Sequence, residues 1–302
     1  MSVYSACGAP AEMPAADIDI ARLKGWEGKT RTVEDVIAPD RVAAMAATLD
    51  WERAPPTGAA LPPGWHWLFF NGAARMSELG PDGHPKRGGF LPPVPLPRRM
   101  WAGGRLAFPG ALRVGETARR ESAVVSVEGK RGRSGDLVFV CVRHRMFGAD
   151  GKLAVEEEHD IVYRGAPAGG ASKPRPAPAP PDAAWRREIR PDPVLLFRYS
   201  ALTFNGHRIH YDRSYATEAE GYPGLVVHGP LIATLLLDLL GQERPAARIE
   251  RFAFRATSPL FDTAPFTVNG VPAADARSVR LWAAGPDAAL AMEAEAILRE
   301  AG

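Results

Sequence analysis

The stretch Phe197–Leu240 decides the fold, and it reads FRYSALTFNGHRIHYDRSYATEAEGYPGLVVHGPLIATLLLDLL. It places three of the seven histidines of the chain, His207, His210 and His228, within 22 residues. A Gly-Pro pair beginning at Gly229 then signals the start of a helix. A buried helix does not require histidines at its start, whereas a catalytic pocket often has titratable groups there. The stretch therefore indicates a pocket at the beginning of a helix.

The helix predicted over His228–Leu240 is apolar on nearly every side, with leucine or isoleucine at most positions. A helix of this kind is expected inside the curve of a sheet rather than on its surface. Asp238 is the exception, and we expect it to face an edge of the fold or a partner. Four segments after the helix have the pattern of antiparallel strands: Ile249–Ala256, Phe266–Val271, Ser278–Ala283 and Ala288–Leu298.

The polar loop before the helix carries groups suited to acid–base chemistry. His210 is the best candidate for a base, because the pKa of an unperturbed imidazole lies near neutrality. Asn205 and His207 lie five and three residues before it, where a tight loop would let them hold a water. The Gly229 N–H at the helix start would stabilise a carbonyl oxygen on which negative charge develops.

A structural interpretation of the same histidines stays open at this point. Each could be a hydrogen-bonded core residue, and His228 could simply cap the helix. Metal binding by the three histidines also stays open, although their spacing matches no zinc pattern. We predict no metal and no separate cofactor.

Composition places the chain among ordinary globular proteins. Its 302 residues are 46% hydrophobic and 24% charged, with a net charge of +2 that gives no case for nucleic acid. The two cysteines, Cys7 and Cys141, lie far apart, so a disulfide framework is not expected. We find no secretory signal and no apolar run long enough to span a membrane, and we expect a cytoplasmic protein.

The first half of the sequence, like the second, has a predicted helix followed by four predicted strands. Pro39–Leu49 is predicted to be a helix, and Trp65–Phe70 is an aromatic strand candidate. Ser77–Gly104 is dense in glycine and proline but keeps large apolar residues, so we expect an ordered loop that lines a pocket. Four strands are expected after it: Leu106–Phe108, Thr117–Glu128, Asp136–Phe147 and Ala154–Tyr163.

The two halves are joined by a segment rich in proline, alanine and glycine. We expect residues 165–185 to be an extended, solvated linker between a first unit, residues 1–164, and a second unit, residues 186–302. Val194–Ser200 is a strand candidate at the start of the second unit. Each half has a helix followed by four strands, which predicts a duplicated α+β unit.

The chain resembles the MaoC-like hydratases and dehydratases in the order of its features. A polar loop ends in His210, about 18 residues follow, and His228-Gly229 then leads into an apolar helix. Their usual loop pattern is G-D-x-N-P-x-H; here Asn205 stands where Asp is usual, His207 where Asn is, and Arg208 where Pro is. Three further stretches resemble the mesaconyl-C4-CoA (3-methylfumaryl-CoA) and itaconyl-CoA hydratase branch: LPPGWHWLFF, SELGPDGHPKRGGFLPPVPLPRRMWAGG and RVGE at Arg113–Glu116. That branch is related to hydroxyacyl-thioester dehydratase type 2.

The resemblance implies a double hot-dog fold, in which each unit is an antiparallel sheet wrapped around a helix. It also implies a catalytic loop in the second unit and an acyl pocket shaped by the first. His210 would be the base, Asn205 would position the water, His207 would be a second acid or base, and the Gly229 N–H would hold the oxyanion. Substrates of the branch carry a free carboxylate, which must meet a cation when buried. The candidate substrate-binding residues are Arg98, Arg99, Arg208 and His228.

The expected activity is the reversible addition of water to a short branched dicarboxylic enoyl-CoA, with CoA as part of the substrate. Three alternatives remain open from the sequence. They are a general (R)-3-hydroxyacyl-thioester dehydratase, a hot-dog thioesterase, and a non-catalytic module that binds acyl-CoA. A homodimer is expected, with neither nucleic acid nor membrane as a partner.

Overall fold

The computed structural model describes residues 18–132, 135–165 and 176–299. Five strands of the first half are β1 (Thr30–Val36), β2 (Arg98–Ala107), β3 (Thr117–Gly132), β4 (Gly135–Phe147) and β5 (Leu153–Arg164). Five strands of the second half are β6 (Trp185–Ile189), β7 (Arg248–Ala256), β8 (Phe266–Pro272), β9 (Ser278–Ala284) and β10 (Leu290–Arg299). The helices are α1 (Ile20–Lys24), α2 (Pro39–Thr48), α3 (Pro193–Leu202) and α4 (Gly229–Glu243). Short helical turns are η1 (Trp65–Leu68), η2 (Met76–Glu78), η3 (Arg208–His210), η4 (Tyr215–Ala219) and η5 (Pro286–Ala288).

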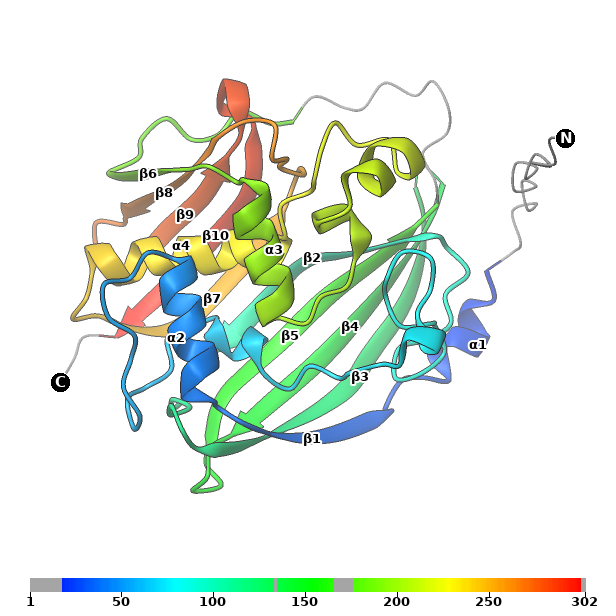
Figure 1. Ribbon diagram of the computed structural model, residues 1–302, viewed down its shortest axis with the longest axis horizontal. Helices are drawn as coiled ribbons and strands as arrows, with labels where there is room; N and C mark the ends of the chain where they lie inside the picture. Colours follow the sequence, from blue (N-terminus) through cyan, green and yellow to red (C-terminus); the bar gives the residue numbers. More distant parts are fainter. Residues whose placement is uncertain (1–17, 133–134, 166–175, 300–302) are drawn as a thin grey trace, which may run out of the picture.

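All of these strands form one antiparallel sheet in the order β1-β3-β4-β5-β2-β7-β10-β9-β8-β6. The order is symmetric about the central pair, because β2-β5-β4-β3-β1 repeats as β7-β10-β9-β8-β6. Figure 1 shows this sheet curving from the first-half strands into the second-half strands. The α+β class and the duplicated unit are confirmed, and the fold is a double hot-dog.

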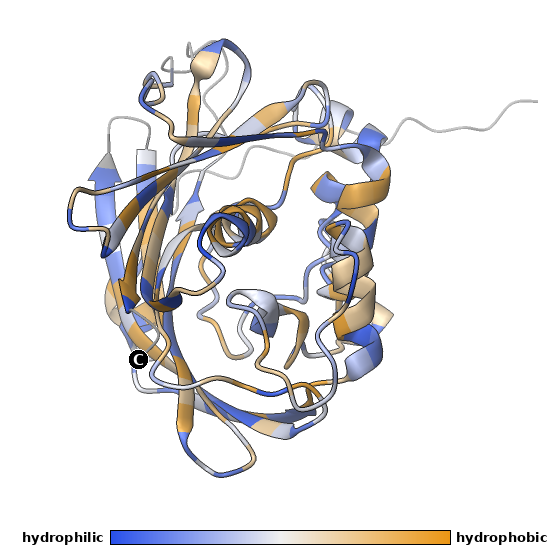
Figure 2. Cartoon of the chain, turned by 90° about the vertical axis from the view of Figure 1, so that its left-hand side faces the viewer, coloured by the Kyte–Doolittle hydropathy of each residue, from blue (hydrophilic) through white to orange (hydrophobic). Residues whose placement is uncertain are grey.

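Helix α4 lies inside the curve of the sheet, as its sequence predicts. All ten residues from Leu231 to Leu240 are buried, and Figure 2 shows the apolar helix nearly end-on with the sheet curving around it. The expectation for Asp238 was wrong, since this side chain is also buried, at 6% exposure. It forms an ion pair with Arg187 (2.7 Å) and accepts a hydrogen bond from Trp51 Nε1 (2.7 Å). Buried carboxylates need such partners to offset their desolvation.

Two strand predictions were wrong because apolar runs alone do not distinguish a strand from a short helix. Val194–Ser200 lies in α3, where the Asp192 side chain accepts a hydrogen bond from Leu195 N and caps the helix. Trp65–Phe70 forms η1 and the turn after it, entered through Gly64 at a φ of 84°. That left-handed conformation favours glycine and turns the chain away from an extended path.

The two halves differ at their centres, which corrects the prediction that each unit wraps a helix of its own. In the first half, the four-residue η1 takes the place that α4 has in the second. The space also holds buried polar groups: Glu157 on β5 contacts His66 Nε2 (3.1 Å) and Trp67 Nε1 (2.9 Å). Helix α2 is instead the counterpart of α3, and the two pack together on the side away from the sheet (Figures 1 and 2).

The predicted linker lies partly outside the described residues, since residues 166–175 are not described. Its described end is not wholly solvated: Ala179 N donates to Ala288 O (2.7 Å), and Leu290 N donates to Ala177 O (2.8 Å). In the described part of the chain, no helix has the length and apolar character needed to cross a membrane. Cys7 lies outside the described residues, and Cys141 is a free thiol on β4.

Candidate active site

His210 lies in η3 and is buried, with 7% of its surface exposed. Its Nδ1 lies 2.7 Å from the carbonyl oxygen of Val226, and a carbonyl can only accept, so Nδ1 carries the proton. The lone pair is therefore on Nε2. Burial, with a smaller contribution from His207, lowers the pKa of His210 to about 3. The imidazole is neutral at physiological pH and able to accept a proton.

His228 packs against His210 and is placed to hold that ring in position. The two rings stack with centroids 3.7 Å apart, and His228 Nε2 lies 2.8 Å from Ser200 Oγ on α3. The side chain of His228 is completely buried. The substrate-binding prediction for His228 therefore does not fit, because its side chain has no exposed surface. His228 is the N-cap residue of α4, but its side chain makes no capping hydrogen bond.

The loop from Phe204 to His207 turns sharply after α3, with Phe204 at a φ of 49°. The Asn205 side-chain oxygen accepts a hydrogen bond from His207 N (3.1 Å), which fixes the turn. The His207 ring lies perpendicular to that of His210, with centroids 5.4 Å apart. Burial, followed by the positive charge of Arg99, lowers the pKa of His207 to about 4. The structure thus brings Asn205, His207 and His210 together, as the sequence predicts.

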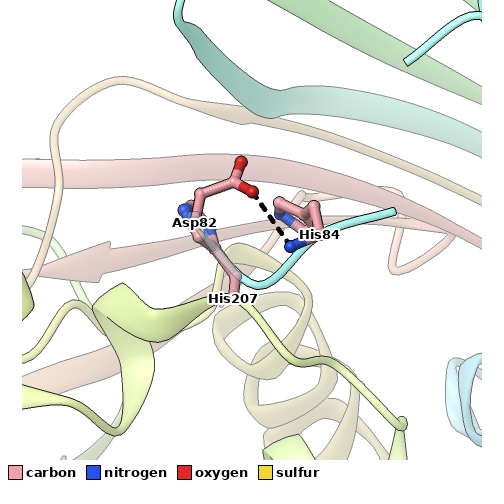
Figure 3. Close-up of side chains that lie close together, drawn as sticks. All are labelled: Asp82, His84 and His207. Atoms are coloured by element: carbon pink, nitrogen blue, oxygen red, sulfur yellow. Dashed lines mark hydrogen bonds between the residues drawn. The ribbon is translucent and has the colours of Figure 1, made fainter. Parts of the chain in front are cut away.

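A loop of the first half completes this group from the other side. Figure 3 shows Asp82 and His84 beside His207, with the Asp82 side chain accepting a hydrogen bond from His84 N (3.0 Å). The rings of His84 and His207 lie 4.3 Å apart. Burial, and then the charge of Arg99, hold the pKa of His84 well below its usual value. Residues about 120 positions apart in sequence therefore form one cluster of side chains.

The loop around Gly83 and the loop around Gly206 lie so close together that position 83 requires glycine. A Cβ on Gly83, whose φ is 84°, would lie 1.9 Å from the carbonyl oxygen of Gly206. Arg208 holds the contact: its N–H donates to Asp82 O (2.9 Å) and its guanidinium to Pro81 O (3.0 Å). The expectation that Ser77–Gly104 is an ordered loop is confirmed for Pro81–His84, whereas its end from Arg98 belongs to β2; that it lines a pocket stays a prediction.

The start of α4 lies next to this group, because His228, which stacks on His210, directly precedes Gly229. Gly229 is the first residue of the helix, so its N–H belongs to the unpaired first turn. A Cβ at this position would meet only the carbonyl oxygen of Trp101, at 3.8 Å. The side of Gly229 on which a side chain would lie is therefore open.

The three candidate arginines differ in their partners. Arg98 forms an ion pair with Glu220 (3.0 Å), and Arg208 forms one with Asp212 (2.8 Å). Arg99 has no carboxylate partner among the described residues, and its charge reaches both His84 and His207. Arg98 and Arg208 are thus already neutralised, and Arg99 is the cation available to an anionic ligand.

The donor set of Asp82, His84 and His207 is the kind that metals use. Their ligand atoms lie within 4.8 Å of one another. The nearby Arg99 opposes this use, because a second cation would be repelled by its charge. The residues fit a metal poorly, and the absence of a metal stays a prediction.

Sequence reasoning missed Asp82 and His84. The only local signal was the Asp-Gly turn at Asp82-Gly83 within a loop expected to line a pocket. Nothing in the spacing connects this turn to Gly206, because the contact is made by the tertiary fold.

A double hot-dog fold with a buried neutral histidine beside the start of a central helix is the arrangement expected of an acyl-thioester hydratase or dehydratase. A solved MaoC-like dehydratase from Phytophthora capsici has this fold, with a TM-score of 0.67 at 14% identity, over 94% of this chain and 100% of that one. The profile of hydroxyacyl-thioester dehydratase type 2 matches residues 64–262. The chain belongs to this family.

Two curated relatives agree with that assignment. The chain is 50% identical over 275 residues to "Mesaconyl-C(4)-CoA hydratase" of Chloroflexus aurantiacus, covering 89% of this chain and 95% of the relative. It is 31% identical over 233 residues to "Hydroxyacyl-thioester dehydratase type 2, mitochondrial" of Schizosaccharomyces pombe, covering 69% and 77%. The protein is an enzyme of the hydratase and dehydratase type, a hydro-lyase.

Proposed function

We propose that this enzyme adds water reversibly across the Cα=Cβ bond of a short branched dicarboxylic enoyl-CoA, of which mesaconyl-C4-CoA is the example. The observation that carries the proposal is Arg99, a cation without a described carboxylate partner, beside neutral histidines in the site. A thioester with a free carboxylate would pair with it, since a buried carboxylate needs a charged donor. The 50% identity to a hydratase named for such a substrate supports this choice.

His210 is the proposed base. Its Nε2 takes a proton from a water held by Asn205 and His207, and the hydroxide oxygen bonds to Cβ. The π electrons move to Cα and the thioester carbonyl, which becomes an enolate. His210 then returns the proton to Cα, so that the elements of water have been added and the base is restored.

The Gly229 N–H is the proposed donor to the enolate oxygen. It lies at the positive end of α4, where an N–H stabilises charge that develops during the reaction.

Asp82 is proposed to supply the carboxylate that the catalytic loop lacks. Asn205 stands where Asp is usual, and an amide cannot take a proton. Asp82 approaches from the first half, within 4.8 Å of the ring nitrogens of His84 and His207. Its negative charge favours any positive charge that develops on these rings during proton transfer.

A general (R)-3-hydroxyacyl-thioester dehydratase is the second candidate, and the likeness to the Schizosaccharomyces pombe dehydratase favours it. Both candidates use the same base and oxyanion donor. They differ in whether the acyl group must carry a carboxylate for Arg99.

The experiment measures hydration of mesaconyl-C4-CoA, itaconyl-CoA and crotonyl-CoA by the wild type, His210→Ala and Asp82→Asn. His210→Ala is expected to lower kcat by about 10²–10⁴-fold, because the base is removed. Asp82→Asn should also lower kcat, whereas Asp182→Asn, at an exposed carboxylate paired with Arg280, should not. Full activity of His210→Ala would refute the mechanism.

The same assay separates the alternatives. A preference for crotonyl-CoA would replace the dicarboxylic substrate with a plain enoyl-CoA. Release of free CoA, detected with a thiol reagent, would indicate a thioesterase. Binding without turnover of any enoyl-CoA would indicate a non-catalytic module.

A further inference from the structure

A cavity of about 1000 Å³ lies at the opposite end of α4 from His210. Its lining includes Leu237, Asp238 and Leu240 near the C-terminal end of the helix. The helix has 15 residues, so the two places are about 20 Å apart. Nothing in the proposed hydration reaction uses this cavity.

The symmetry of the sheet explains why the cavity is there. Helices α2 and α3 both have ten residues and both begin with proline. The second residue after each helix has a positive φ, 57° at Asp50 and 49° at Phe204. Trp51 therefore occupies the position that corresponds to Asn205 of the catalytic loop.

The other walls of the cavity correspond in the same way. It is lined by Pro63 before η1, as the active site is bordered by Val227 before α4. It is also lined by Arg248 at the start of β7, as Arg98 stands at the start of β2. The cavity is thus the counterpart of the active site, related to it by the duplication.

The catalytic groups have no equivalents in this cavity. Trp51 replaces the amide of Asn205, and its Nε1 is engaged by Asp238. The residues that follow, Glu52–Gly58, contain no histidine to correspond to His210. His66 lines the cavity, but its Nε2 lies against the buried Glu157. A ligand here would be bound without being hydrated.

The charge of the cavity points to an anionic ligand. Five arginines line it, against three carboxylates, of which Asp238 is already paired with Arg187. The charged lining residues are Arg53, Arg113, Arg244, Arg248, Arg299, Asp50, Glu52 and Asp238, and the apolar ones include Trp51, Trp65, Phe108, Leu112, Leu240 and Leu298. Arg248 and Arg299 are directly opposite each other on β7 and β10. Neither has a carboxylate partner in the described ranges, and like charges in this arrangement repel. A bound anion would relieve the repulsion.

We propose that this cavity is a second, non-catalytic binding site for a CoA thioester. The arginines would hold its phosphates, and the apolar walls would hold its acyl part. The volume falls in the range of small-molecule sites. The proposal rests on the thioester chemistry of the family but not on the identity of the enoyl substrate.

Calorimetric titration with butyryl-CoA tests the proposal, because this saturated thioester cannot be hydrated. The wild type should bind two molecules per chain. Arg248→Ala/Arg299→Ala should bind one, or bind the second at least tenfold more weakly, with unchanged kcat on the enoyl substrate. Arg251→Ala, an exposed arginine of β7 outside the cavity, should keep both sites.

Binding of a single molecule by the wild type would overturn the proposal, and so would two sites unaffected by the double substitution. Inorganic phosphate at equal ionic strength is the second probe. If it displaced the second molecule as effectively as butyryl-CoA, the cavity would be a plain anion site and the proposal would fail. Failure of the hydration assay would leave these binding results unchanged, so the two proposals can fail separately.

Discussion

Arg99 is the residue on which we expect acyl selectivity to depend. Arg99→Ala should lower kcat/KM for mesaconyl-C4-CoA by about 10–100-fold, since a hydrogen bond to a charged group contributes about 1.5–3 kcal/mol. The value for crotonyl-CoA, which has no carboxylate, should change little. Arg98→Ala is the control, because Arg98 is already paired with Glu220. Equal losses for both substrates would show that Arg99 is structural.

The histidines of the site should make the protein sensitive to acid. Burial depresses the pKa of His207 to about 4 and of His210 to about 3, from an ordinary value of about 6.5. Between these values the unfolded chain binds more protons than the folded chain. Stability is therefore fully present above pH 6.5 and is lost as the pH falls, by about 1.4 kcal/mol per pH unit for each such histidine.

His207→Gln tests this linkage. Denaturant unfolding of the variant between pH 6.5 and 4.5 should show a shallower fall in the free energy of unfolding than the wild type. The carboxylates titrate alike in both proteins and cancel in the comparison. Parallel curves would mean that His207 is not held neutral by the fold.

At the scale of elements, the contact between loop 80–84 and the catalytic loop should control activity. Gly83→Ala places a Cβ 1.9 Å from Gly206 O, so the loops must separate. We expect kcat to fall by more than tenfold. Gly58→Ala is a matched control: Gly58 has a φ of 87°, but nothing lies within 4 Å of its added Cβ. Both variants carry similar backbone strain, so equal activity would argue against a catalytic role for the loop contact.

Elements whose signals are local could be predicted from the sequence. The apolar run after Gly229 predicts that α4 is enclosed. The alternation of apolar and polar residues predicts the strands that follow it. Val194–Ser200 was misassigned because an apolar run fits either a strand or a helix, although Asp192 and Pro193 form a helix start. The His210 loop was found through its residue types and resemblance. Asp82 and His84 could not be found, because only the closure of the sheet brings them to His207.

At the scale of the whole molecule, a buried carboxylate in α4 links an ion pair of the second half to a hydrogen bond from the first half. Trp51 of the first half and Arg187 of β6 both bind Asp238 in α4. Arg187→Met should lower the free energy of unfolding by about 3–5 kcal/mol, because it leaves a buried charge unpaired. Arg187→Met combined with Asp238→Leu should recover much of that loss, as measured by denaturant unfolding. No recovery would indicate that packing around Arg187, rather than charge, is responsible.

The continuous pairing of β2 with β7 has an evolutionary consequence. In a dimer of identical hot-dog subunits, symmetry copies every mutation into both sites, so neither site can change alone. Fusion of the two units removes that constraint. One end of α4 could keep its histidines while the other exchanged them for tryptophan and arginine. In a fused chain, a single gene can therefore specialise the two ends independently.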